Sequence, residues 1–147
     1  MHNAPLHRAK HLPLHRAKHT GSLPANSSWL TFFKTNFFGK NYCNIKGRAS
    51  RKEYWASTIL WSIFAGLLKI LLVITMPTED STPHFILINF IDLYGTIPLW
   101  ALSFRRFHDF DMSAWWTLAI IPNSFLPFFK GDKHDNRFGK NIYEEVE

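Results

Sequence analysis

The sequence predicts an all-α, multi-pass membrane protein with about three transmembrane helices, the third short, and an N-terminal amphipathic helix at the membrane interface. Three observations lead to this prediction. Residues 1–53 are polar and basic, whereas residues 54–129 contain three long apolar runs. Ten of the 17 Lys and Arg residues precede Tyr54. A basic connector, RRFHDFDMSAWW at Arg105–Trp116, joins the second and third runs, as expected of a cytoplasmic loop.

The amino-acid composition indicates which class of binding partner to expect. The net charge of +6 over 147 residues favours anionic lipid headgroups, and nucleic acid is not expected because most of the chain enters lipid. Cys43 is the only cysteine, so no intramolecular disulfide is expected, and no cofactor or metal site is predicted. Four segments are predicted: a disordered His-rich tail (1–26), an interfacial segment (27–53), the membrane domain (54–129) and a polar C-terminal tail (130–147).

The first 40 residues divide into a His-rich tail and a predicted amphipathic helix. The tail repeats PLHRAKH at Pro5–His11 and Pro13–His19, which favours disorder, and a pH-sensitive basic arm is the functional alternative. Aromatic residues then recur at i, i+3, i+4 and i+8 within Ser27–Lys40, one face of a helix. We expect this helix to lie in the headgroup plane, and an ordinary helix packed on protein is the alternative. The stripe consists of Trp29, Phe32, Phe33 and Phe37.

The first span begins at a capping box, S-x-x-E, at Ser50–Glu53. The Ser50 hydroxyl is expected to accept the Glu53 amide hydrogen, and the Glu53 carboxylate to reach back to the Ser50 amide. From Tyr54 to Met76 a helix rises about 33 Å, enough to cross a hydrocarbon core.

Two further apolar runs follow. The turn Pro77–Pro83 has two acids and no Lys or Arg, so it is expected to face away from the cytoplasm. The second span covers His84–Phe104. The third run, Ala114–Phe129, is about 24 Å long as a helix and contains two prolines. We expect a short full span, and the alternative is a segment that returns at Pro122-Asn123 and leaves the C-terminus cytoplasmic.

Three motifs carry a family resemblance. GRASRKEYW lies at Gly47–Trp55, RRFHDFDMSAWW at Arg105–Trp116 and NRFG at Asn136–Gly139. In this order they resemble the GRxxRxEYW, RRxHDxxxSxWW and NRFG elements of a bacterial inner-membrane family catalogued as domain of unknown function 805. The resemblance covers roughly Trp29–Asn141. It implies a multi-pass inner-membrane protein and supplies no activity.

Basic residues of these motifs form the first candidate site. They are expected to converge on the cytoplasmic surface and bind phospholipid phosphates, because guanidinium groups bind phosphate bidentately. The positive-inside rule alone is the alternative explanation. The candidate residues are Arg48, Arg51, Lys52, Arg105, Arg106 and His108.

Lys69 and Asp92 form the second candidate site, since they are charges inside predicted spans. Lys69 lies about 10 Å and Asp92 about 12 Å from the outer ends of their spans, so an ion pair is predicted, with Asn89 one turn away. A proton or ion relay is the functional interpretation, and a structural clasp or a snorkelling lysine is the alternative.

A catalytic or metal-binding role for His108, with Asp109 and Asp111 beside it, finds little support. The candidate further ligands, His134 and Asp135, are expected on the opposite membrane face if the third run spans, and no nucleophile motif surrounds Ser113. We therefore expect a non-enzymatic protein of the bacterial inner membrane, with a cytoplasmic N-terminus, that contacts anionic lipid or partner membrane proteins. A small transporter or channel subunit using Lys69 and Asp92 is the alternative function. Self-association is left open.

Overall fold

The computed structural model describes residues 22–75, 81–118 and 125–143. Their order is α1 (Trp29–Phe37), α2 (Arg51–Thr75), α3 (Ser81–His108) and two short 3-10 helices, η1 (Ala114–Leu118) and η2 (Leu126–Phe128). Pairing of extended backbone in these ranges is limited to one isolated bridge between Asn136 and Gly139. The all-helical class predicted from the sequence is confirmed. The His-rich repeats and most of the Pro77–Pro83 turn lie outside the described residues.

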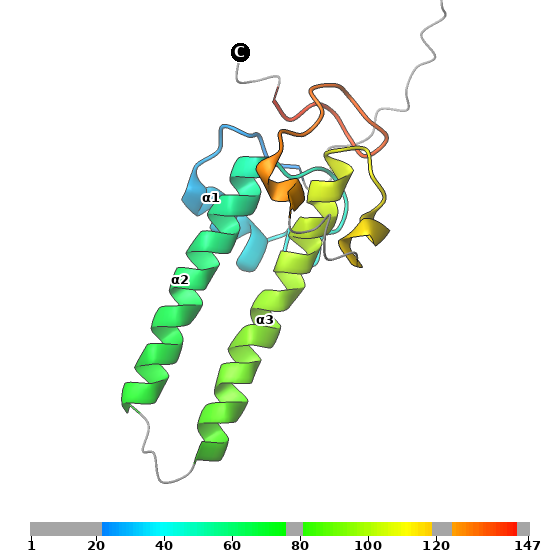
Figure 1. Ribbon diagram of the computed structural model, residues 1–147. Helices are drawn as coiled ribbons and strands as arrows, with labels where there is room; N and C mark the ends of the chain where they lie inside the picture. The colour runs from blue at the N-terminus through cyan, green and yellow to red at the C-terminus, as the bar shows by residue number, and fades with distance from the viewer. Residues whose placement is uncertain (1–21, 76–80, 119–124, 144–147) are drawn as a thin grey trace, which may run out of the picture.

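The long helices α2 and α3 form an antiparallel hairpin (Figure 1). Both are long and apolar enough to cross a membrane, and only 11% of the most apolar part of α2 and 28% of that of α3 is buried. Their apolar side chains therefore point outward, as they do in helices surrounded by lipid. We call the end where α2 begins and α3 ends the polar end.

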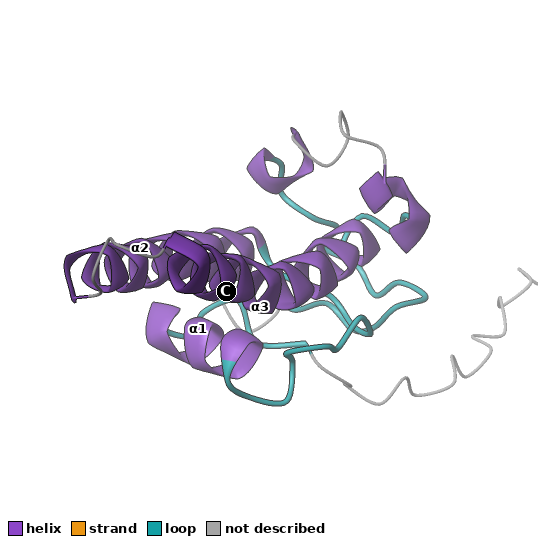
Figure 2. Ribbon diagram, turned by 90° about the horizontal axis from the view of Figure 1, so that it is seen from below, coloured by secondary structure: helices purple, strands orange, loops and turns teal. Residues whose placement is uncertain are grey.

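Helix α1 packs beside the hairpin near its polar end (Figures 1 and 2). The Ser28 hydroxyl accepts the amide hydrogen of Thr31 and caps the helix. Phe37 is buried and stacks on Trp61 of α2 with ring centroids 4.5 Å apart. Trp61 fits against α3 because residue 95 is glycine, where an added Cβ would lie 2.1 Å from the indole nitrogen.

The aromatic stripe of α1 was expected to face lipid, and this was wrong for its buried members. Phe32 and Phe37 are 0% and 1% exposed and pack on protein. Trp29 remains 46% exposed and Phe38, just beyond the helix, 59%. The helix therefore divides its aromatic residues between a protein contact and an exposed edge.

The third apolar run does not form a full span in the described residues, which corrects the expected short third helix. Its first part is η1, which packs against α3, and its last part is η2, which returns to the first turns of α2. There Trp55 Nε1 donates to the Pro127 carbonyl at 3.1 Å. Both ends of the run thus lie at the polar end. Pro127 lies within η2, and a proline cannot supply the amide hydrogen that a continuous α-helix needs. Residues 119–124 of the run lie outside the described residues.

Candidate functional site

A buried ion pair joins α2 and α3 at the polar end. The Ser50 hydroxyl accepts the Glu53 amide hydrogen at 3.0 Å, which confirms half of the capping box. The Glu53 carboxylate, however, does not make the predicted return to Ser50. Its Oε1 accepts from Arg105 at 2.8 Å, because a buried charge gains more from a guanidinium partner than from a neutral amide. Both side chains are fully buried.

Asn36 of α1 completes this pair. Its Oδ1 accepts from Arg105 at 2.7 Å, and its Nδ2 donates to Glu53 Oε1 at 3.1 Å and to Ser57 Oγ at 2.8 Å. The side-chain amide of Asn36 therefore accepts a hydrogen bond from α3 and donates hydrogen bonds to α2. Asn36 is 0% exposed, so α1 is anchored to the hairpin by a polar contact as well as by Phe37.

Asp109, directly after α3, is the centre of a second buried cluster. Its Oδ1 accepts from Arg48 Nε at 2.9 Å, and its Oδ2 accepts from Arg106 at 2.5 Å and from the Tyr143 hydroxyl at 2.7 Å. Burial raises the pKa of the Asp109 carboxyl, while the Tyr143 hydroxyl and the two guanidinium groups lower it. Burial and the neighbouring carboxylate raise the pKa of Tyr143 to about 12.

The guanidinium groups of this cluster also hold the C-terminal segment. Arg48 donates to the His134 carbonyl at 2.7 Å and to that of Asp132, and Arg106 donates to the Phe129 carbonyl. Gly131 passes so close to Asp109 that an added Cβ would lie 1.7 Å from Oδ2. The segment after the third apolar run is therefore docked on the polar end.

The NRFG and RRFHD motifs meet in this docked segment. The ring of Phe138 stacks on His108 with centroids 3.8 Å apart, and Asn136 Nδ2 donates to the His108 carbonyl at 2.8 Å. His108 Nδ1 lies 3.2 Å from the Gly47 carbonyl. Arg137 pairs with Asp111 at 3.1 Å. The three sequence motifs thus form one composite structure.

The structure corrects the expected surface position of most basic candidates. Arg48, Arg105 and Arg106 do come together, but they are at most 1% exposed and their charges face Glu53 and Asp109. His108 is 8% exposed. The positive-inside rule counts charges in a loop and does not give side-chain direction.

Arg51 and Lys52 are the exposed members of the candidate set. Arg51 donates to the Phe128 carbonyl at 3.3 Å, and Lys52 to the Asn26 carbonyl at 3.4 Å. Both acceptors are neutral backbone oxygens, so neither positive charge is neutralised by a carboxylate in these contacts.

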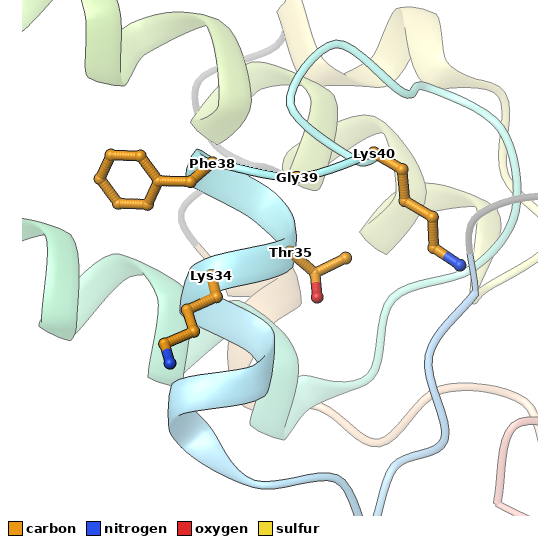
Figure 3. A pocket seen from close by; sticks show the side chains of 5 residues that line it. All are labelled: Lys34, Thr35, Phe38, Gly39 and Lys40. Carbon is orange, nitrogen blue, oxygen red and sulfur yellow. The ribbon is translucent and has the colours of Figure 1, made fainter.

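A second basic surface lies at the end of α1. A hollow of about 770 Å³ is lined by Lys34, Thr35, Phe38, Gly39 and Lys40. Lys34 and Lys40 extend to different sides of the last turn, and Phe38 points away from both (Figure 3). The Phe38 ring lies 6.2 Å from that of Phe64, which is 42% exposed on α2. We call Lys34, Phe38 and Lys40 the α1 surface.

The predicted contact between Lys69 and Asp92 is present. Lys69 Nζ lies 2.5 Å from Asp92 Oδ1, and the side chains are 31% and 57% exposed. Asn89 is not a member of this pair, because its Nδ2 donates to the Phe85 carbonyl of its own helix at 2.7 Å. The pair therefore links α2 and α3 on an open face.

Two partners in the buried clusters, Asn36 and Tyr143, are absent from the residues that the sequence singles out. Neither belongs to one of the three motifs, and Tyr143 lies in a tail whose charges are mixed. Only their contacts in the fold identify them. Within the described ranges no three His, Cys, Asp or Glu side chains are grouped as metal ligands.

Comparison with known proteins shows which family the chain resembles. A family profile described as "Protein of unknown function (DUF805)" matches residues 42–140. The inner membrane protein YhaH of Escherichia coli K12 is 35% identical over 111 residues, which cover 68% of this chain and 88% of YhaH. The inner membrane protein YhaI of the same strain is 30% identical over 114 residues, covering 69% and 88%. No solved structure matches the chain.

Proposed function

Because the chain belongs to the DUF805 family, whose relatives YhaH and YhaI are inner membrane proteins, we propose that it is a non-enzymatic component of the bacterial inner membrane that binds anionic phospholipid. Its hairpin crosses the membrane twice. The polar end and both termini lie in the cytoplasm. The distribution of Lys and Arg over the chain supports this orientation, since ten of 17 precede Tyr54.

The single observation that carries lipid binding is the α1 surface. It places two lysines and an exposed phenylalanine around one hollow at the end of α1, and the phenylalanine ring lies 6.2 Å from that of Phe64 on α2. A phospholipid has complementary groups, a negatively charged phosphate for the lysines and an apolar acyl chain for the phenylalanine. Residues 1–52 contain no Asp or Glu, so no carboxylate from this part of the chain competes for the lysines. Arg51 and Lys52 extend the positive charge toward the start of α2.

The absence of enzymatic activity is supported by the state of the residues that a catalytic centre at the RRFHD segment would use. Asp109 is held by two guanidinium groups, and His108 lies between Phe138 and the Gly47 carbonyl. These contacts are those of a packed structural joint.

The test is lipid selectivity of the full chain reconstituted in phosphatidylcholine vesicles. Energy transfer from tryptophan to trace amounts of labelled phosphatidylglycerol or labelled phosphatidylcholine reports which lipid lies beside the protein. The variant Lys34→Gln/Lys40→Gln is expected to lower the preference for phosphatidylglycerol by about fivefold per lysine.

The matched control is Lys46→Gln/Lys130→Gln, which removes the same charge from exposed positions outside the α1 surface. We expect the control to retain the preference. Equal losses in both double variants would mean that total charge alone attracts the lipid, and would overturn the assignment to α1.

A further inference from the structure

The hairpin has one covered and one open face. Helix α1 covers the face that carries Trp61 and Tyr94, through Phe37 and through a hydrogen bond from the Tyr94 hydroxyl to the Phe37 carbonyl at 2.6 Å. Figure 2 shows α1 on one side of the α2–α3 pair. The Lys69–Asp92 pair lies on another side, which α1 does not cover.

This open face is polar along its length. Residues at helical spacing of three or four lie on one face, which gives one stripe on each long helix. We define the polar stripe as Ser62, Gly66 and Lys69 of α2 with Asn89, Asp92 and Thr96 of α3. All six are exposed or half-buried.

Such a face is costly in lipid. Ionisable side chains inside spans almost always face other protein or water, because hydrocarbon does not solvate them. Asp92 is nevertheless 57% exposed, and Lys69 lies six residues, about 9 Å, before the end of α2. Lys69 pairs with one oxygen of Asp92, and both side chains keep exposed area, so the single chain does not enclose either charge. The single chain is therefore incomplete at this face.

A cavity extends the same face toward the polar end. It measures about 290 Å³, and its lining includes Thr58, Thr96 and Thr117. Among the described residues, the buried hydroxyls of Thr58 and Thr117 have no hydrogen-bond partner. Buried hydroxyls without partners destabilise a structure. This part of the face therefore also has polar groups that the single chain leaves unsatisfied.

We propose that the polar stripe is the contact surface for a second copy of this chain. The stripe carries both a cation and an anion at one level, so it is complementary to itself. A two-fold axis parallel to the helices keeps every residue at its depth and brings Lys69 of each copy to Asp92 of the other. The two ion pairs then form a four-charge network between the copies.

Gly66 supports close approach of the second copy. A Cβ added at Gly66 would meet nothing within 4 Å, so the glycine is not required by the fold of one chain. Ser62 precedes it by four residues, and a small residue every fourth position is the pattern that lets membrane helices pack closely. The contact between copies does not depend on lipid binding at the α1 surface.

The first test is disulfide cross-linking in membranes. Cys43 is the only native cysteine and is exposed, so Cys43→Ser gives a clean background. Gly66→Cys and Ser62→Cys are expected to give a covalent dimer on oxidation. The control Leu67→Cys has the same depth, is 63% exposed and points away from the stripe, so it should remain monomeric. Equal cross-linking at Leu67, or none at either stripe position, would overturn the proposal.

The second test is self-association of Gly66→Leu, measured by energy transfer between labelled copies in phosphatidylcholine vesicles. We expect about a tenfold weaker association with unchanged insertion, because the larger side chain occupies space only in the dimer. Unchanged association would refute a close contact at Gly66. Cross-links to a different protein would overturn the second copy in favour of another partner. Reaction of Ser62→Cys with a water-soluble thiol reagent would overturn it in favour of a water-filled ion path.

Discussion

Replacing Glu53 by glutamine is expected to lower the free energy of unfolding by about 3–5 kcal/mol, because it leaves the Arg105 charge buried without its counter-ion. Both side chains are 0% exposed, and the closest atoms are 2.8 Å apart. For charge centres about 4 Å apart, the attraction is about 4 kcal/mol at an effective dielectric constant of about 20. Glutamine keeps the shape and one acceptor oxygen, so the loss reports the charge itself.

Denaturation of the purified chain in mixed micelles, followed by tryptophan fluorescence, measures this difference. The matched control is Asp111→Asn, which breaks an ion pair with Arg137 whose partners are 61% and 48% exposed. Solvent screening limits that pair to about 0–1 kcal/mol. The double variant Glu53→Met/Arg105→Met is expected to recover most of the loss, since it removes both charges together. If Glu53→Gln cost no more than Asp111→Asn, an uncompensated Arg105 charge would not be costly at this position, and the reasoning from burial would be refuted.

Three further predictions concern other parts of the structure. The pKa of Tyr143 is raised to about 12 from 10.0, so its contribution to stability is complete below pH 10 and is lost as the pH rises toward 12. Tyr143→Phe should remove this component from the stability profile measured across that range, and an unchanged profile would contradict it. Gly95→Ala should destabilise the monomer in detergent by about 1–3 kcal/mol, because the added methyl group displaces Trp61. Gly66→Ala should not destabilise it, because nothing lies within 4 Å of the added Cβ. Equal losses of stability would refute this difference between the two glycines. The proposed orientation puts the polar end, with the docked C-terminal segment, in the cytoplasm, so a C-terminal phosphatase fusion should be inactive and a fluorescent-protein fusion active; an active phosphatase would contradict that orientation.

Much of the fold followed from periodicity and hydropathy. The start of α2 at the Ser50–Glu53 capping box and the existence of α1 and α3 are local properties of apolar runs and capping residues. The Lys69–Asp92 contact also followed, because equal depth in antiparallel helices is fixed by counting residues from their shared turn.

The buried clusters did not follow, because their partners are distant in the sequence. Arg105 and Glu53 are 52 residues apart, and Arg48 and Asp109 are 61 apart. A loop rich in arginine has the same composition whether the side chains face water or carboxylates. From the sequence, a return of the third apolar run was only the alternative to a short span, since residue count alone does not distinguish the two.

The position of the ion pairs at the polar end has a physical reason. Between helices in lipid there is little hydrophobic driving force, because the surrounding acyl chains are as apolar as the side chains. The apolar parts of α2 and α3 therefore do little to select one arrangement over another. The Glu53–Arg105 pair and the Asp109 cluster do so, because each carboxylate is satisfied only when particular turns of α2, α3 and the C-terminal segment meet. A buried ion pair adds little net stability when desolvation offsets the attraction, so the effect of these pairs here is to fix which turns meet. It follows that variants of the clusters should still insert both long helices into the membrane, but lose the docking of α1 and of the NRFG segment, and with it the α1 surface proposed to bind lipid.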